Sequence, residues 1–255
     1  MFKKATLFAA LFGAMAMGGC GTGTDETSEI INNLVQAGYH AEDIDVFDGL
    51  VYVQKDAHVT LQASREMIQV RPGTTEEQYR TTNLVNAPLK ICVVPTSKFV
   101  TYSQLNAGLD AAIAKYNAEN LSITFVRGSA SDCGATISAK TTQGVGGNSG
   151  FPSGGLPYGT INIGTGLQSY SVGVNTHVVT HEIGHTIGFR HSDYYNRTIS
   201  CGSGGNEGTA GVGAILIPGT PSTAVVGGSI MNSCFRSTET GEFTSSDLTA
   251  LNYLY

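Results

Sequence analysis

Apolar residues in the first third of the chain follow short local patterns. Residues 30–35 repeat at helical spacing after a polar tether at residues 21–27, and Gly38 should end this helix. Asp48-Gly49 stands between two apolar runs, which predicts a two-residue hairpin turn. Residues 71–80 are polar and predict a linker or a short surface helix.

After residue 86 the pattern changes to short apolar runs alternating with longer helical periodicity, which predicts an α/β (α+β) fold. Thr101 followed by Gln104 is a capping box, and the helix it begins should end near Asn117. The residues at 144–159, rich in Gly, Ser and Pro, predict a surface loop beside an edge strand. The predicted strands are 91–94, 121–126, 135–139 and 160–163, and a last helix follows residues 245–247.

A helix beginning near Asn175 carries the densest cluster of chemical groups. Residues 181–191 read His-Glu-Ile-Gly-His-Thr-Ile-Gly-Phe-Arg-His. His181 and His185 are one helical turn apart, so both imidazoles lie on one face. Two neutral imidazoles in this arrangement can reach one zinc ion.

The neighbouring residues complete this candidate zinc site. Gly188 should end the helix, because glycine tolerates the left-handed conformation at which helices stop. The chain can then turn and bring His191 back as a third ligand. Glu182 lies beside the first ligand, where its carboxylate can act on a zinc-activated water as a general base. A chance His-Glu-x-x-His motif on a structural helix would not also place Gly188 and His191 at these offsets.

The string from His181 to Asp193 resembles the metzincin clan of zinc endopeptidases and, within it, the bacterial dual-action HEIGH metallopeptidases. The resemblance implies a metzincin-like zinc peptidase domain with a twisted mixed sheet, an active-site helix and an edge strand that pairs with extended substrate. It also implies one catalytic Zn²⁺ and a protein or peptide substrate. Gly-Gly-Ser-Ile-Met-Asn at 227–232 resembles the Met-turn, in which Met231 would form an apolar floor below the ligands.

Other readings of the same residues remain open. The chain could be a non-catalytic surface lipoprotein that binds zinc, or a zinc hydrolase acting on a non-peptide amide. His177 lies one turn before His181, but a fourth ligand there would close the metal site, so we expect it to pack at the start of the helix.

The composition fits an exported protein. The 255 residues include 13% charged residues, 33 glycines and no tryptophan, and the net charge is −6. A chain with this net negative charge lacks the basic surface that nucleic-acid binding needs. We expect a monomer.

The N-terminus has the pattern of a secretion signal peptide. A cationic start with Lys3 and Lys4 precedes an apolar stretch at residues 5–17, too short to span a bilayer. Met-Gly-Gly-Cys, ending at Cys20, resembles a bacterial lipobox, which implies a lipoprotein signal peptide at residues 1–19 and a lipid anchor on Cys20. Gly21, the residue after this cysteine, resembles a sorting signal for the outer membrane or cell surface. An ordinary signal peptide with a nearby cysteine is the alternative.

Four further cysteines indicate two disulfides, for which three pairings exist. We predict that Cys201 pairs with Cys234, tying the chain after the third ligand to the Met-turn. Cys92 would then pair with Cys133, joining the first strand of the α/β region to the loop before residue 135. The rival pairings link Cys92 to Cys201 or to Cys234.

The sequence divides into a small segment at residues 20–85 and the expected catalytic domain at 86–255. The segment is small for an independent domain. We therefore expect it to be pro-like, covering the cleft and holding the enzyme latent, with residues 71–80 exposed to cleavage. A carboxylate could block the zinc, and Asp56 is the first candidate, with Asp48 behind it. The alternative is that the segment is a permanent part of the fold.

Overall fold

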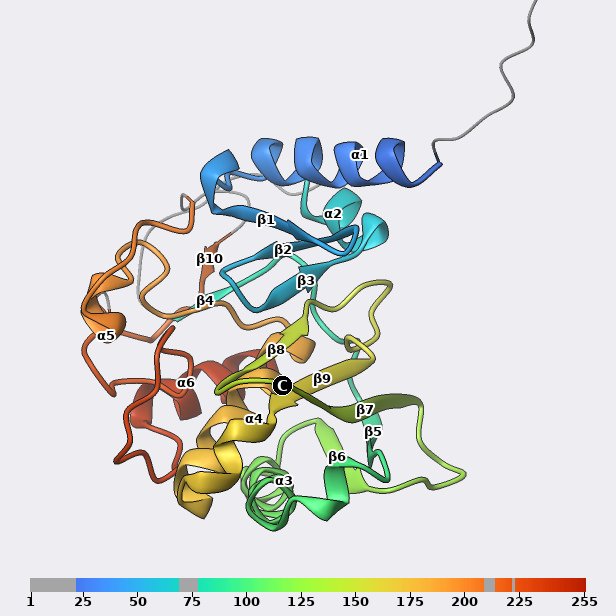
Figure 1. Ribbon diagram of the computed structural model, residues 1–255, viewed down its shortest axis with the longest axis vertical. Coiled ribbons are helices and arrows are strands. Elements are labelled where there is room, and N and C mark those ends of the chain that lie inside the picture. Colours follow the sequence, from blue (N-terminus) through green and yellow to red (C-terminus); the bar gives the residue numbers. More distant parts are fainter. Residues whose placement is uncertain (1–21, 69–77, 209–213, 222) are drawn as a thin grey trace, which may run out of the picture.

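The computed structural model describes residues 22–68, 78–208, 214–221 and 223–255 (Figure 1). The predicted signal peptide at residues 1–19 and the lipidation site Cys20 lie outside these ranges. Most of the predicted linker, residues 71–77, also lies outside them. None of the helices in the described ranges is long and apolar enough to cross a membrane.

A twisted eight-stranded sheet runs through the molecule in the order β1-β2-β3-β8-β9-β7-β5-β6 (Figure 1). Strands β5, β6, β7 and β9 are parallel, β8 is antiparallel to β9, and β3 is parallel to β8. The expected mixed α/β fold is confirmed. The strands are β1 (Ile44–Phe47), β2 (Leu50–Val53), β3 (Ala57–Val59), β5 (Leu89–Pro95), β6 (Ile123–Arg127), β7 (Ala135–Thr142), β8 (Gly147–Gly150) and β9 (Thr160–Gly164).

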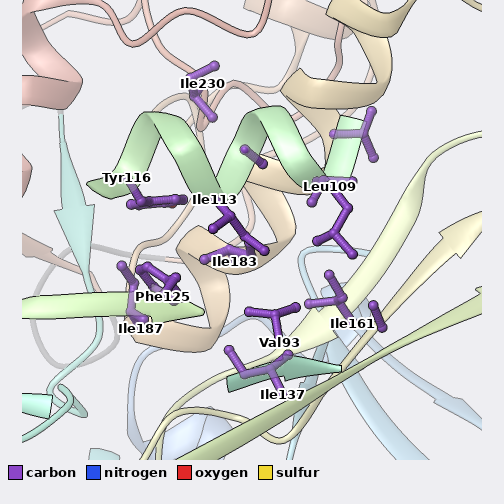
Figure 2. Close-up of a cluster of buried hydrophobic side chains, with 14 of the residues drawn as sticks. Val93, Leu109, Ile113, Tyr116, Phe125, Ile137, Ile161, Ile183, Ile187 and Ile230 are labelled. Carbon is purple, nitrogen blue, oxygen red and sulfur yellow. The ribbon is translucent and has the colours of Figure 1, made fainter. Parts of the chain in front are cut away.

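Two long helices form the main core with the parallel strands. Helices α3 (Ser103–Ala118) and α4 (Val172–Ile187) pack against each other and over this part of the sheet (Figure 2). Leu109 and Ile113 of α3 and Ile183 of α4 meet the strand residues Val93 and Ile137 in one buried apolar cluster. Packing of this kind fixes the helix that carries the candidate ligands.

The N-terminal elements build a second, smaller core on strands β1–β3. Helices α1 (Thr22–Gln36) and α2 (Leu61–Met67) lie at the end of the molecule opposite α3 (Figure 1). Their buried side chains include Leu34 and Met67, and they also contact Phe151, which follows β8. A short 3-10 turn, η1 (Ala41–Asp43), connects α1 to β1.

The predicted hairpin is confirmed, because β1 and β2 are antiparallel and joined by Asp48 and Gly49, both with positive φ. The expected tether at residues 21–27 is wrong, since helix α1 already begins at Thr22. Asp25 lies in its first turn, where a carboxylate interacts favourably with the helix dipole.

Two further expectations need correction. Helix α3 does not begin with the capping box, because Thr101 lies in the preceding 3-10 turn η2 (Phe99–Thr101), and its hydroxyl donates to the Lys98 carbonyl. The predicted loop at residues 144–159 contains strand β8, which pairs on both sides. The strand was not predicted because its first and last residues are glycine, which is typical of loops. Glycine is needed at position 147, since a Cβ there would lie 2.5 Å from the Glu182 carboxylate.

Residues 78–85 pack into the body of the α/β region. Strand β4 (Tyr79–Arg80) pairs with β10 (Ile215–Leu216) in a separate two-stranded sheet. The buried Gln78 amide donates to the Asp247 carboxylate at 3.0 Å. The Thr81 N–H donates to the Gly188 carbonyl.

The C-terminal third supplies loops around the candidate site and a last helix. It contains α5 (Thr198–Cys201) and α6 (Ser245–Leu254), whereas the 3-10 turn η3 (Thr165–Ser169) precedes α4. The predicted disulfides are both present, Cys92–Cys133 and Cys201–Cys234.

Candidate metal centre

Helix α4 has well-defined ends. The Ser171 hydroxyl accepts a hydrogen bond from the Val174 N–H at 3.2 Å, which caps the first turn. The helix ends at Gly188, whose φ of 114° lies in the left-handed region, as the sequence predicted. A side chain there would also meet the Asn83 carbonyl oxygen at 2.6 Å. Glycine is therefore required at this position both for backbone conformation and for space.

The turn after Gly188 brings the three motif histidines together. The Nε2 atom of His181 lies 3.1 Å from Nε2 of His185 and 3.2 Å from Nε2 of His191. His185 and His191 are fully buried and His181 is nearly so. The three ring nitrogens thus converge on one buried point.

The other nitrogen of each ring faces a hydrogen-bond acceptor. For His181, His185 and His191 in turn, the acceptors are the Ile230 carbonyl at 2.9 Å, the Phe189 carbonyl at 2.8 Å and the Glu207 carboxylate at 2.9 Å. Carbonyls and carboxylates hold a proton on Nδ1, so when the rings are neutral the Nε2 lone pairs are directed at one another. Lone pairs this close repel unless a cation lies between them.

The distances fit a metal ion. Donor atoms that bind one zinc ion tetrahedrally at 2.0–2.1 Å lie about 3.3 Å apart. Burial lowers the pKa of His185 well below its ordinary value, which favours the neutral, ligating form. His191 differs, because the Asp56 and Glu207 carboxylates outweigh burial and raise its pKa to about 10. A metal ion would compete with that proton.

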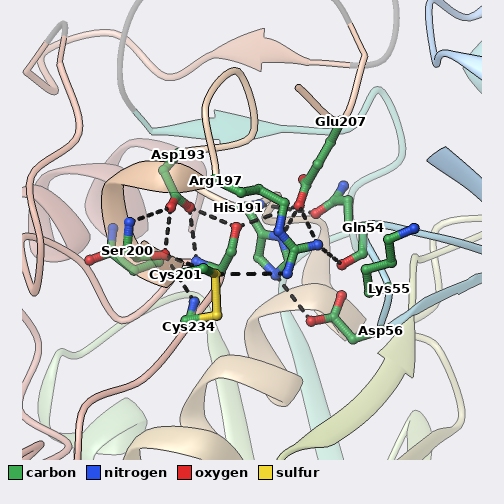
Figure 3. Close-up of polar contacts among 12 residues, drawn as sticks. Gln54, Lys55, Asp56, His191, Asp193, Arg197, Ser200, Cys201, Glu207 and Cys234 are labelled. Atoms are coloured by element: carbon green, nitrogen blue, oxygen red, sulfur yellow. Dashed lines mark hydrogen bonds and ion pairs between the residues drawn. A yellow bond between two sulfur atoms is a disulfide. The ribbon is translucent and has the colours of Figure 1, made fainter. Parts of the chain in front are cut away.

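Asp56 from the N-terminal segment lies at the same point. Its carboxylate oxygens are 3.1 Å from Nε2 of His191, 3.6 Å from that of His185 and 3.8 Å from that of His181. These four residues offer ligand atoms that all lie within 4.8 Å of one another. Figure 3 shows Asp56 and Glu207 on opposite sides of the His191 ring.

Glu182 lines a cavity of about 290 Å³ together with His181 and His177. The Ser149 hydroxyl of β8 donates to its carboxylate at 2.8 Å. Burial, with the Asp56 carboxylate as a second cause, raises the pKa of Glu182 well above its ordinary value. A cation held by the histidines would act in the opposite direction and favour the carboxylate form.

The turn at residues 229–232 passes below the ligand helix. Met231 is buried, and its sulfur would lie 2.6 Å from a Cβ on Gly184, so the glycine of the motif makes room for the methionine. The Ser192 N–H donates to the Met231 carbonyl at 2.8 Å. This turn therefore contacts both the helix and the loop that supply the histidines.

His177 is separate from the ligand cluster. It is buried, and its Nδ1 lies 3.6 Å from the Glu239 carboxylate. Its ring faces the cavity rather than joining the four residues that can hold a metal. The expected packing role at the helix start is compatible with this position.

Several contacting residues were missed by the sequence analysis. Glu207 has no motif around it, and Ser149 lies in the strand that was predicted as a loop. Asp193 was quoted only as the end of the motif string. Its carboxylate accepts hydrogen bonds from the backbone and hydroxyls of Ser200 and Ser233, beside the Cys201–Cys234 disulfide (Figure 3).

Comparison with known proteins gives one extensive sequence match. A profile of the dual-action HEIGH metallo-peptidase family matches residues 51–255, which include Asp56 and the whole motif. No curated protein sequence matches the chain.

The chain is also similar to two solved structures. One is high choriolytic enzyme 1, a hatching enzyme zinc-protease from the medaka fish Oryzias latipes, at 18% identity over 68% of this chain and 94% of that chain, with a TM-score of 0.44. Another is myroilysin, at 16% identity over 68% of this chain and 96% of that chain, with a TM-score of 0.46.

Proposed function

The chain belongs to the dual-action HEIGH metallopeptidase family, and from this premise we propose that it is a zinc-dependent endopeptidase with Glu182 as its general base. His181, His185 and His191 would hold one zinc ion through their Nε2 atoms. The observation that carries the proposal is the convergence of three ring nitrogens beside a carboxylate that lines a cavity.

The chemistry follows from the charges at this point. A zinc ion, when bound, supplies a Lewis acid that polarises a peptide carbonyl and lowers the pKa of a water molecule. The Glu182 carboxylate takes a proton from the attacking water and then passes it to the leaving amine. Ser149, hydrogen-bonded to the same carboxylate, holds Glu182 in one orientation during both transfers.

The surrounding residues keep the ligands in place. Glu207 and the carbonyls of Ile230 and Phe189 orient the three rings, and hydrogen bonds of this kind strengthen histidine as a ligand. Met231 provides the apolar support below the helix.

Glu182 argues against a purely structural zinc site. Three histidines suffice to hold a metal in a binding protein, and a buried carboxylate beside them would add only the cost of desolvation. A zinc hydrolase acting on a non-peptide amide would use the same groups. The family membership favours the peptide substrate.

We also propose that the protein is exported and anchored in a bacterial outer membrane or at the cell surface through lipid on Cys20. The cationic and apolar leader before this cysteine supports the proposal. Metabolic labelling with a radioactive fatty acid should mark the wild-type chain and not the Cys20→Ser variant. Equal labelling of both would contradict it.

A digest of proteome-derived peptides tests the proposed activity. The zinc-loaded chain should cut internal peptide bonds, chelation should stop the cleavage, and added zinc should restore it. The new termini report the cleavage specificity at the same time. Cleavage that persists in chelator, or products trimmed only from their ends, would contradict a zinc endopeptidase.

A further inference from the structure

The turn between strands β2 and β3 has a strained backbone. Gln54 and Lys55 have φ values of 62° and 76°, in the left-handed region that side chains with a Cβ avoid. This conformation strains the backbone of a residue with a Cβ, and positions with positive φ in hairpin loops are normally taken by Gly, Asn or Asp. Strain of this kind persists where surrounding contacts hold it, and it concentrates at functional sites.

The contacts that hold this turn come from the candidate metal centre. The Gln54 side-chain oxygen accepts a hydrogen bond from the backbone N–H of His191 at 3.1 Å. The Gln54 carbonyl accepts another from the Arg197 guanidinium at 3.2 Å. The strained turn is thus tied to the loop that carries the third histidine, and the next residue is Asp56 (Figure 3).

The Asp56 carboxylate faces all three motif histidines, and only one of its oxygens has a hydrogen-bond partner among the described residues. One oxygen lies 3.1 Å from Nε2 of His191. The other is buried and has no hydrogen-bond partner among the described residues, although it lies only 3.6 Å from Nε2 of His185. A carboxylate facing three imidazole nitrogens is the donor set of a closed four-coordinate zinc site.

The strand that follows Asp56 covers the neighbouring edge of the sheet. Ala57 pairs with Ser149 and His58 with Gly150, in parallel register. The Ser149 N–H donates to the Asp56 carbonyl at 2.8 Å. Strand β8 pairs with β9 at Gly147 and Asn148 and with β3 at Ser149 and Gly150, so β3 occupies the second half of this edge, where an extended peptide would otherwise pair.

We propose that Asp56 is the fourth metal ligand and that, with strand β3 on β8, it holds the enzyme in a closed state. The inhibitory part rests on the proposed peptidase function, whereas the ligand assignment requires only that the histidines bind metal. Catalysis would require Asp56 to leave the metal and β3 to leave the β8 edge together, because both belong to residues 54–59.

Cobalt(II) substitution with azide titration tests the ligand assignment without measuring activity. Azide binds a cobalt ion that has an open position and changes its visible absorption spectrum. The full chain is compared with Asp56→Ala and with Asp56→Asn, which keeps the side-chain shape. The control is Asp45→Asn, since the Asp45 carboxylate is half-exposed and forms an ion pair with Lys55 at 3.1 Å, outside the group of residues that can hold a metal.

The wild-type and Asp45→Asn spectra should not respond to azide, whereas both Asp56 variants should respond. Cleavage of short peptides by the Asp56 variants should rise by about tenfold or more, as the fraction of molecules with an open position rises. A wild-type spectrum that responds to azide as readily as the variants would overturn the proposal, and this measurement needs no variant to fold. Variants that bind azide but cleave nothing would refute the peptidase function and leave Asp56 as a ligand.

Discussion

The carboxylate of Glu207 lies 2.9 Å from Nδ1 of His191, on the side of the ring opposite Asp56. Glu207 is itself buried and also lies 3.3 Å from the Arg197 guanidinium. A residue sixteen positions beyond the motif thus sets the orientation of its third histidine.

Changing Glu207 should weaken zinc binding without removing a ligand. We expect Glu207→Ala to lower zinc affinity by roughly 10–100-fold, and Glu207→Gln, which still offers an oxygen acceptor, to lose less. Competition with a chromogenic chelator measures both. Glu242→Ala, at an exposed ion pair with Lys115, is the control and should bind zinc as the wild type does. Unchanged affinity in Glu207→Ala would show that the hydrogen bond does not orient His191.

Gly188→Ala should destabilise the protein more than Gly202→Ala. Both glycines have positive φ, so both substitutions strain the backbone by roughly 1–2 kcal/mol. Only at position 188 would the new Cβ also meet backbone, the Asn83 carbonyl oxygen at 2.6 Å, whereas nothing lies within 4 Å at position 202. Urea unfolding gives the two free energies. Equal losses of unfolding free energy in the two variants would mean that the backbone at Asn83 moves away from the new Cβ at no cost.

The two disulfides should differ in their effect on zinc. They close loops of 41 and 33 residues, so removing either should cost a similar free energy of unfolding, about 3–4 kcal/mol. Cys201→Ser with Cys234→Ser should also speed zinc release, because Cys234 and Ser200 lie in the hydrogen-bond network around Asp193. Cys92→Ser with Cys133→Ser should leave zinc release unchanged. Equal release rates in the two double variants would contradict this reading.

His177 should make stability fall in mild acid. Burial is the main cause that lowers its pKa to about 4, with the His181 ring acting in the same direction and Glu239 opposing. The unfolded chain therefore takes up the proton first. Stability is full above about pH 6.5 and is lost, by up to about 3 kcal/mol, as the pH falls toward 4.

Urea unfolding of the metal-free protein from pH 7 to pH 4 measures this loss. His177→Gln should give a shallower decline, because glutamine takes up no proton. The same slope in the variant and the wild type would assign the acid sensitivity to other groups.

The convergence of the three histidines could be predicted because its information is local. His181, His185, Gly188 and His191 lie within eleven residues; helix geometry places the first two histidines, and the turn at Gly188 brings back the third. The hairpin at Asp48 and the two disulfides were likewise predicted from short patterns and cysteine positions.

The surroundings of the ligands could not be predicted in the same way. Strand β8 is bounded by glycine at both ends, so its sequence resembles a loop, and its pairing with β3 joins residues about 90 positions apart. Glu207 lies in a loop whose sequence has no periodic pattern, so its contact with His191 could not be predicted. The sequence marks Asp56 only as an available carboxylate. Its place among the histidines depends on the positive φ of Gln54 and Lys55, a conformation that glutamine and lysine rarely adopt.

One comparison tests the central claim most directly: peptide cleavage by the zinc-loaded Asp56→Ala chain with and without Glu182→Gln, together with the zinc content of each. Removing Asp56 opens the site, and glutamine keeps the shape of residue 182 but cannot accept the proton. We predict one zinc per chain in both proteins and cleavage of internal peptide bonds only where Glu182 is present. Full cleavage by the Glu182→Gln chain at equal zinc content would contradict the account.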